Sequence, residues 1–537
     1  MSVVKTESMH RRIAVATVIV TISVLLSRVL GFFREWALAH QIGANATTDA
    51  YNAAFTLPDF LNYLIAGGAL SVTFIPVFAK YVAEEREDQG WHVFSTVITV
   101  MGFVVIALVA IAEVFASPLV KVVAPGFNPP EHALAVFLTR LMLPAQICFY
   151  EGSILSAVQY AKGKFVIPSL APIIYNSCIV LGGLLLSSRI GIGGFAVGVL
   201  SGAFLGNFLL QVYGAGRVGA VFSPNFSVSH PGFRFFLKLS IPIMLALGLT
   251  FADDWIMRHY ASFLQHGSIT WLTYGKNLMR VPLGLVGQAI GVASFPILAQ
   301  LYSEKKYDQL NQILNSTFKA LIFILVPISA FTIAESFPLV HLVFTRTRLN
   351  EFDFHATAVA LSFFSIGMFA WGAQNILARG FYATRNTITP AVVGTLMTFL
   401  SLPLYRFLMT RSQYRGLALA SSIGIIAYTV VLFVLLIRRT ENRDANSLVW
   451  FFARVSAASA AAGVACYALG TWTERFFPWR RPIGALAVLT IVTTIGVVLL
   501  GLLMKLFGVS EFETYLKQAW SALSRKLGPA TGSAAEL

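Results

Sequence analysis

Charged residues are scarce in this sequence. Asp, Glu, Lys and Arg make up only 12% of the 537 residues, whereas hydrophobic residues make up 57%. A typical soluble domain has about 25% charged residues, so this balance argues against an ordinary soluble domain. Uncharged apolar runs at 93–112, 165–188 and 483–504 each reach the roughly 20 residues that a spanning helix needs. The composition therefore predicts a membrane protein.

Cysteine and the common catalytic motifs are also scarce. Cys148, Cys178 and Cys466 lie inside apolar stretches, which argues against a disulfide framework or a CxxC metal site. The sequence has no P-loop, HExxH or GxSxG motif. A GxGxxG pattern at 214–219 follows an apolar segment and not a strand, so it lacks the dinucleotide-binding context. We expect no enzymatic activity and no cofactor, and the sequence does not specify a metal ion.

Positive charge outweighs negative charge, with a formal net charge of +15. The basic residues do not form one stripe, so we expect no nucleic-acid partner. Clusters precede the first apolar segment and recur in about every second loop, as the positive-inside rule requires. These residues are Lys5, Arg11, Arg12, Lys162, Lys164, Lys305, Lys306, Arg379, Arg385, Arg438, Arg439 and Arg443. The pattern predicts a multi-pass protein with both termini in the cytoplasm.

Apolar segments separated by Gly, Pro or charged residues fill most of the chain. They lie near 13–33, 50–80, 92–115, 133–160, 165–188, 193–213, 235–260, 269–300, 313–335, 356–382, 388–409, 414–437, 448–471 and 483–504. The loops between them are short, so no soluble catalytic domain is inserted. We predict an all-α polytopic membrane protein with about 14 transmembrane helices.

An internal repeat divides these segments into two sets of six. The sequence FIPVFA around Pro76 resembles FPILA around Pro296, and Tyr160 with Pro168 corresponds to Tyr382 with Pro390, at an offset of about 220 residues. An even number of helices gives both halves the same orientation, as in parallel-repeat transporters. We predict an N-terminal lobe at 1–230 and a C-terminal lobe at 231–440 around a central cavity. Two extra helices at 441–510 and a cytoplasmic tail at 511–537 follow.

Several charged residues lie inside the predicted membrane helices, where an arginine costs roughly 2.5–3.5 kcal/mol. Arg28 and Arg34 are about 120° apart around their helix and roughly 9 Å apart along it, so both can border one wide cavity. The alternative is that they pair with Glu35 and Asp49 at the interface. Further candidates are Asp49, Asp253, Asp254, Lys276, Asn277 and Arg280. Because an unpaired buried carboxylate needs a proton or a metal ion, Asp253 and Asp254 are candidates for ion coupling.

Glycines occupy corresponding places in the two predicted lobes. Gly67 and Gly68 lie in the second apolar segment, and Gly284 and Gly287 lie in the eighth. Glycine in a membrane helix permits either close packing or bending. The matched positions favour hinges, with close packing as the alternative.

Five stretches carry a resemblance to a known family. They are SRVLGFFRE at Ser27–Glu35, PSLAPIIYN at Pro168–Asn176, GFYATRNTITP at Gly380–Pro390, and the longer Thr48–Phe78 and Val281–Ala299. They resemble the MurJ/MviN lipid II flippases of the MOP exporter superfamily. The resemblance implies a bacterial inner-membrane protein that moves lipid II, an undecaprenyl-diphosphate-linked peptidoglycan precursor, to the outer leaflet by alternating access. We further expect transport to be driven by the membrane potential and/or an ion gradient. The implied partners are lipid II, the phospholipid membrane and proteins of cell-wall synthesis.

The family pattern also assigns roles to residues. It implies that Arg28 and Arg34 hold the diphosphate, with Asp49 as a further functional residue. Asn62 or Tyr63 and Asn277 stand where the family usually has cavity arginines. Lys276 and Arg280 lie close enough to Asn277 to replace the second missing arginine.

The departures at Asn62 and Asn277 keep other functions open. These are export of another polyprenyl-linked oligosaccharide or of a drug by a related MOP exporter, and a non-transporting role as a cell-wall scaffold. A polyprenyl-phosphate glycosyltransferase would need acidic residues in a large outer loop, and the predicted outer loops are short.

Overall fold

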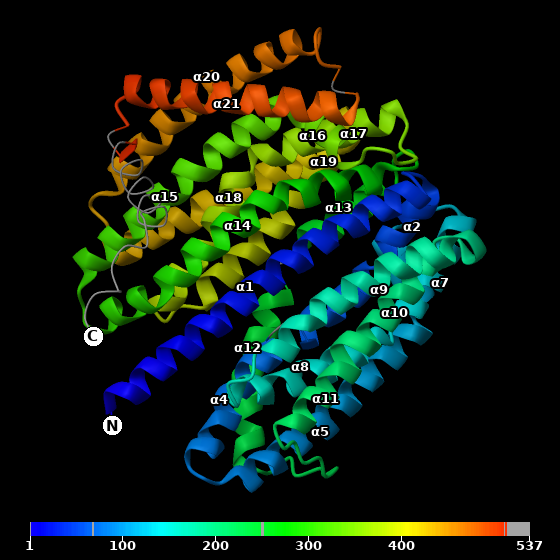
Figure 1. The fold of residues 1–537 in the computed structure, drawn as a ribbon, viewed down its shortest axis with the longest axis vertical. Helices are drawn as coiled ribbons and strands as arrows, with labels where there is room; N and C mark the ends of the chain where they lie inside the picture. The colour runs from blue at the N-terminus through cyan, green and yellow to red at the C-terminus, as the bar shows by residue number, and fades with distance from the viewer. Residues whose placement is uncertain (1, 67–68, 249–251, 479, 510, 513–537) are drawn as a thin grey trace, which may run out of the picture. The chain divides into compact units, whose positions relative to one another are not determined.

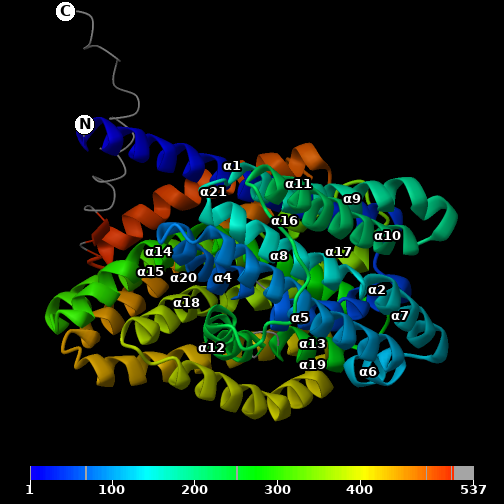
Figure 2. The same ribbon diagram turned by 90° about the horizontal axis from the view of Figure 1, so that it is seen from below.

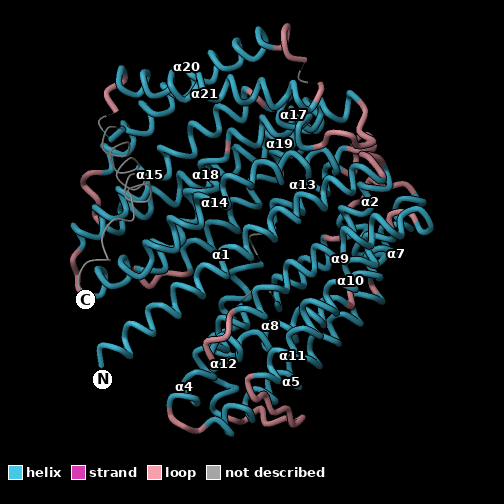
Figure 3. The backbone as a smooth tube through the Cα atoms, in the orientation of Figure 1, coloured by secondary structure: helices cyan, strands magenta, loops and turns pink. Residues whose placement is uncertain are grey.

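The computed structural model describes residues 2–66, 69–248, 252–478, 480–509 and 511–512. Within these ranges every regular element is a helix and none is a strand, which confirms the predicted all-α fold. Figure 3 shows the helices following one another with short loops between most of them.

The helices are labelled in chain order (Figure 1). They are α1 (Ser2–Gln41), α2 (Ala46–Ala54), α3 (Thr56–Leu61), η1 (Asn62–Ala66), α4 (Ala69–Ala83), α5 (Glu87–Val114), α6 (Ala116–Val123), α7 (Pro129–Met142), α8 (Ala145–Ala161), α9 (Val166–Ile190), α10 (Gly193–Gly202), η2 (Ala203–Leu209), α11 (Leu210–Arg217), α12 (Pro231–Gly248), α13 (Ala252–Ala261), α14 (Ser268–Ser303), α15 (Tyr307–Ala334), α16 (Ser336–Val343), α17 (Glu351–Ile366), α18 (Met368–Ala383), α19 (Ile388–Thr440), α20 (Ala445–Thr473) and α21 (Pro482–Leu506). The elements η1 and η2 are π-helices.

Many of the described helices are both long enough and apolar enough to cross a membrane. Eight stretches of helix are long and apolar enough to cross a membrane, and α17 and α18 together form a ninth that is bent by 42°. Each predicted apolar segment lies on one helix or on consecutive helices. The polytopic membrane fold is therefore confirmed, while the count of fourteen spans stays a prediction.

Breaks in the helices fall close to predicted boundaries. The predicted segments 388–409 and 414–437 both lie in α19, which breaks at Ser412 and Gln413. Gln413 has φ +49°, the left-handed region, and this turns the chain between the two halves. Gly416 follows, and a Cβ there would come within 2.0 Å of the Leu408 carbonyl oxygen. Only glycine fits this tight reversal.

The chain divides into two compact units. Unit 1 comprises Met1–Tyr274, Val343–Ala360 and Gly394–Ser421, and unit 2 comprises Gly275–Leu342, Leu361–Val393 and Ser422–Leu537. The helices α14, α16, α17 and α19 therefore contribute residues to both units. The lobes predicted at 1–230 and 231–440 follow the sequence repeat instead, and they stay a prediction.

Among the described residues of unit 1, two buried apolar clusters stand out. In the first, Phe74 of α4 packs edge-on against Phe236 of α12, with ring centroids 5.9 Å apart, and lies 6.3 Å from Phe94 of α5. In the second, Leu38 of α1 and Phe195 of α10 belong to a cluster that also includes residues of α2, α7 and α9. The second cluster holds α1 and α2, which carry the predicted site residues Arg28, Arg34 and Asp49, against α7, α9 and α10.

A buried apolar cluster of unit 2 lies between α15, α20 and α21. Val326 of α15, Val455 and Ala458 of α20, and Leu500 of α21 are buried in one cluster. The two helices predicted as additions to the repeat, α20 and α21, thus pack on α15 within a single unit.

A row of glycines allows α10 and η2 to approach α9 closely. Gly194, Gly198, Gly202 and Gly206 recur every four residues, so they lie along one face. A Cβ on any of them would come within 2.6–2.9 Å of a backbone oxygen of α9. The two helices lie side by side in both views (Figure 1; Figure 2). Small residues at such an interface let backbones pack tightly within a membrane.

We predict that Gly198→Ala destabilises the protein. The added Cβ would lie 2.6 Å from the Cys178 carbonyl oxygen, and backbone cannot move aside cheaply. Overpacking of this kind costs roughly 1–3 kcal/mol. The thermal melting midpoint of the purified protein in detergent should fall. Gly216→Ala is the matched control, because nothing lies within 4 Å of its added Cβ. Equal melting midpoints for the two variants would contradict the prediction.

Candidate functional site

The two predicted cations of α1 keep part of their side chains accessible. Arg34 contacts Glu35, with 2.8 Å between Nη2 and Oε1, and its side chain is 29% exposed. Arg28 is also partly exposed. Beside it, Ser27 Oγ accepts a hydrogen bond of 3.2 Å from Asn176 Nδ2 of α9, which fixes the rotation of α1. The predicted pair of Arg34 with Glu35 is therefore present, and accessible surface remains for a ligand.

Asp49 is buried in the first turn of α2 and holds the start of α14. Its Oδ2 accepts a hydrogen bond from the Gly267 N–H at 2.7 Å. Its Oδ1 accepts from the Thr270 N–H at 2.8 Å and from the Thr270 hydroxyl at 2.7 Å. The first N–H groups of a helix have no acceptor within the helix, and a carboxylate there is also favoured by the helix dipole. Asp49 therefore acts as a cap that one helix provides to another.

Sequence reasoning singled out Asp49 but missed this partner. The residue before α14 is Gly267, which has no side chain to cap the helix. A helix start without its own Ser, Thr, Asp or Asn cap is a signal that an acceptor comes from elsewhere. The sequence does not indicate which residue provides this acceptor.

Further contacts lie around the Asp49 cap, all within unit 1. Trp36 Nε1 donates to the Thr345 carbonyl (3.0 Å), the Arg348 N–H to the Ala39 carbonyl (3.1 Å), Arg258 Nη1 to Thr56 Oγ1 (2.8 Å), and the Gly126 N–H to Ser262 Oγ (3.0 Å). We call these contacts together with the Asp49 cap the clasp. The clasp joins α1–α3 and the segment after α6 to residues that follow them by more than 130 positions.

Asn62 begins the π-helical turn η1 in the second predicted span. Its side chain is partly exposed. Such turns widen a helix locally and occur frequently at functional sites. The predicted hinge residues Gly67 and Gly68 follow η1 directly but lie outside the described residues.

The polar residues of α14 differ in their surroundings within unit 2. Lys276 is only 1% exposed, and its Nζ lies 5.3 Å from the ring centroid of Trp371 and 5.8 Å from that of Phe364. These distances allow cation–π attraction. Asn277 is partly exposed and Arg280 is exposed. Of the two cations predicted to replace a missing arginine, Arg280 is therefore accessible, while Lys276 is enclosed by aromatic rings.

Asp253 lies in the first turn of α13 and binds two hydroxyl groups of α19 within unit 1. Tyr405, which is buried, donates from its hydroxyl to Oδ1, and Ser421 donates to Oδ2 at 2.9 Å. Asp254 follows in the same turn. Among the described residues, no three His, Cys, Asp or Glu side chains converge as metal ligands. The role of Asp253 and Asp254 in ion coupling stays a prediction.

The predicted hinge glycines of the eighth span lie within a continuous helix. The helix α14 runs unbroken from Ser268 to Ser303 through Gly284 and Gly287. Bending there stays a prediction. The predicted site residues also fall in both units: Arg28, Arg34, Asp49, Asn62, Asp253 and Asp254 in unit 1, and Lys276, Asn277, Arg280, Gly284 and Gly287 in unit 2.

The apolar spans and the charged side chains placed on them define a multi-pass membrane protein. The sequence model of the family Lipid II flippase MurJ matches residues 38–483, most of the chain. The protein belongs to this family, as the sequence resemblance predicted.

Named relatives agree with the family match. The chain is 28% identical over 433 residues to the probable lipid II flippase MurJ of Buchnera aphidicola, covering 80% of this chain and 84% of that protein. It is 27% identical over 471 residues to the lipid II flippase MurJ of Burkholderia cenocepacia, covering 85% and 89%. The alignments therefore run through most of both proteins.

Solved structures share the fold. A lipid II flippase MurJ in an inward closed conformation superimposes with a TM-score of 0.72 at 23% identity, covering 89% of this chain and 98% of that one. An inward-facing multidrug resistance MATE family transporter of the MOP superfamily superimposes with a TM-score of 0.62 at 12% identity, covering 79% and 98%. The chain thus shares its fold with both of these transporters.

We predict that Asp49→Ala destabilises the protein, because it removes the acceptor at the centre of the clasp. The change leaves the N–H groups of Gly267 and Thr270 without their acceptor, which costs roughly 1–3 kcal/mol. The melting midpoint of the purified protein should therefore fall. Thr270→Val removes the hydroxyl, which donates to Asp49 and accepts from Asn52 Nδ2 at 3.2 Å, but it keeps both main-chain donors and should have a smaller effect. Thr270→Ser keeps the hydroxyl and should melt like the wild type. An Asp49→Ala variant that melts like the wild type would show that the cap contributes nothing.

Proposed function

We propose that this protein moves lipid II from the inner to the outer leaflet of the bacterial inner membrane for peptidoglycan synthesis. The observation that carries the proposal is the family match over residues 38–483. The partly exposed Arg28 and Arg34 on α1 support it, because a diphosphate needs cations. The protein acts as a transporter and not as an enzyme.

In this proposal arginine side chains bind the diphosphate. Arg28 and Arg34 provide planar guanidinium groups that can donate two parallel hydrogen bonds to phosphate oxygens. Arg280 is a better candidate than Lys276 for a third cation, because Arg280 is exposed and Lys276 is buried between rings. Asn62 and Asn277 donate hydrogen bonds where the family usually has arginine. The polyprenyl tail remains in the lipid.

The clasp acts as the outer gate in this proposal. With the N-terminus in the cytoplasm, α1 crosses the membrane once and places Trp36 and Ala39 on the outer side. The Asp49 cap would then close the outer end while the substrate enters from the inner leaflet. Opening the clasp releases the substrate outward as the lobes 1–230 and 231–440 rock against each other. Gly67, Gly68, Gly284 and Gly287 are the proposed hinges.

The membrane potential can drive the export of a dianion. Each charge that crosses 100 mV gains about 2.3 kcal/mol, so two charges gain roughly 4–5 kcal/mol when both cross the full field. Asp253, held by the hydroxyls of Tyr405 and Ser421, or its neighbour Asp254 would bind a cation or a proton during the reset. Proteins of cell-wall synthesis are further proposed partners.

Complementation tests the proposed function. Expression in bacteria depleted of their own lipid II flippase should restore growth and the appearance of lipid II in the outer leaflet, and Arg34→Ala should abolish both. Arg189→Ala is the matched control, because it removes an exposed charge at the end of α9. Asp253→Asn and Asp254→Asn should lower transport at limiting sodium or proton gradients if they couple an ion.

Other outcomes of this experiment point elsewhere. Absence of rescue by a well-expressed wild type would indicate a different polyprenyl-linked substrate or a drug. Rescue by Arg34→Ala equal to that of the wild type would favour a scaffold. Normal transport by both aspartate variants at every sodium concentration and pH would remove the coupling role.

A reversible disulfide tests the gate. A Cβ on Gly43 would lie 3.4 Å from the Cβ of Arg348, close to the roughly 3.5–4.5 Å of a disulfide. In a background with Cys148, Cys178 and Cys466 replaced by alanine, the pair Gly43→Cys and Arg348→Cys should cross-link on oxidation. We expect oxidation to stop outward transport and reduction to restore it. Each single variant is the control. Undiminished transport by the fully cross-linked protein would rule out the clasp as a gate.

A further inference from the structure

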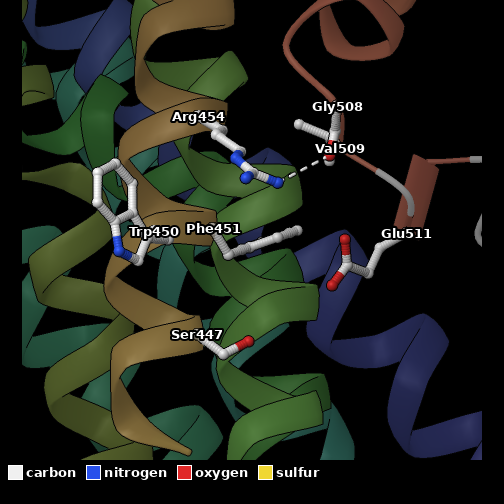
Figure 4. Close-up of a pocket in the computed structure, with 7 residues that line it drawn as sticks. All are labelled: Ser447, Trp450, Phe451, Arg454, Gly508, Val509 and Glu511. Atoms are coloured by element: carbon white, nitrogen blue, oxygen red, sulfur yellow. Dashed lines mark hydrogen bonds between the residues drawn. The ribbon is translucent and has the colours of Figure 1, made fainter.

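A pocket of about 410 Å³ lies in unit 2 between the start of α20 and the chain just after α21. Its walls are Ser447, Trp450, Phe451 and Arg454 on α20, and Gly508, Val509 and Glu511 after α21 (Figure 4). The close-up shows Arg454 above the Phe451 ring, and the Glu511 carboxylate on the opposite wall. None of these residues belongs to the proposed transport site.

The charges around this pocket leave an excess of positive charge. Glu511 is paired with Lys319 of α15, with 2.7 Å between Oε1 and Nζ. Lys319 also lies 5.6 Å from the ring centroid of Phe451. Arg454 donates from Nη1 to the Gly508 carbonyl oxygen at 3.1 Å. Its side chain is exposed, so the rest of the guanidinium remains accessible to a ligand. Among the described residues around the pocket, two cations against one carboxylate favour an anion.

The pocket also lies at a definite depth along the membrane helices. The apolar helix α21 ends at Leu506, and Gly508 follows two residues later, so the Arg454–Gly508 hydrogen bond places the guanidinium level with the end of a span. One turn away on α20, Trp450 is 67% exposed. Tryptophan is enriched where the hydrocarbon meets the headgroups. The pocket therefore lies at the level of the lipid phosphates.

We propose that this pocket binds the phosphate group of an anionic phospholipid. The Arg454 guanidinium binds the phosphate oxygens, the Ser447 hydroxyl donates a hydrogen bond to the headgroup, and Trp450 packs against the first part of the acyl chains. Basic pockets between transmembrane helices bind such headgroups. The bound lipid would stabilise the packing of α20 on the end of α21. By the predicted orientation it belongs to the inner leaflet.

A membrane lipid is a better occupant than free phosphate. A free ion needs only the charged wall, whereas Trp450 and Phe451 add apolar surface that a phosphate ion cannot use. A lipid brings both a phosphate and a chain to this depth. The proposal does not depend on the transported substrate, so it stands or falls separately from the proposed function.

Lipid titration of the purified full-length protein in mild detergent tests the site. Native mass spectrometry should show tighter binding of phosphatidylglycerol than of phosphatidylcholine, and phosphatidylglycerol should raise the melting midpoint. Arg454→Gln should weaken phosphatidylglycerol binding about fivefold, the effect of removing one basic residue near a lipid surface. Arg438→Gln is the matched control, because it removes an exposed charge from the end of α19 and should leave binding unchanged.

Three results would overturn the proposal. They are equal binding of the two lipids, unchanged phosphatidylglycerol binding by Arg454→Gln, and full displacement of the lipid by inorganic phosphate at low millimolar concentration. Arg454→Lys is a conservative control that separates loss of the binding site from misfolding, because it keeps the charge but loses the planar guanidinium group. It should bind phosphatidylglycerol with an affinity between those of the wild type and Arg454→Gln.

Discussion

The start of a buried helix has N–H groups that need acceptors, and unit 1 is arranged around one solution to this constraint. At the start of α2, the Asn45 side chain accepts from the Thr47 and Thr48 N–H groups. Because Asn45 caps its own helix, the Asp49 carboxylate one turn later is available to another one. It satisfies three donors at the start of α14. The helices α2 and α14, which are distant in sequence, are thus fixed to each other by hydrogen bonds to one carboxylate. The remaining contacts of the clasp lie in the same unit.

The same constraint limits where helices break. In a membrane, irregular backbone is tolerated only where protein or water satisfies its polar groups. Gln413 interrupts α19 between two predicted spans, and Gly416 lets the chain reverse against the Leu408 carbonyl. The π-helical turn at Asn62–Ala66 keeps its hydrogen bonds internal while changing the helix locally. Local changes of this kind let a helix redirect its side chains without exposing unpaired N–H groups to lipid.

Hydropathy predicted the fold because spanning a membrane is a property of a local stretch of residues. The all-α class, the helical segments and the turn between 409 and 414 could all be read in this way. The residues that contact the site residues could not be predicted from hydropathy. Lys276 was singled out because it lies next to Asn277, where the family usually has a cavity arginine, but Phe364 and Trp371, which enclose it, come from α17 and α18. Asp49 was noticed because a charge is expensive in a membrane, yet its acceptor role depends on Gly267 and Thr270, more than 200 residues away.

A clasp made of hydrogen bonds suits a gate that must open repeatedly. An apolar interface would expose all of its buried surface to water on opening. N–H groups and a carboxylate that become exposed form hydrogen bonds with water instead. Each hydrogen bond to a charged group contributes only about 1.5–3 kcal/mol net. The three bonds to Asp49 then add up to roughly 4.5–9 kcal/mol, and the roughly 4–5 kcal/mol available to an exported dianion matches only the lower end of that range. A ligand shifts such an equilibrium only through its different affinity for the two states. Arginines that bind the diphosphate better in one state than in the other would meet this requirement, while Asp49 sets the equilibrium that they act upon.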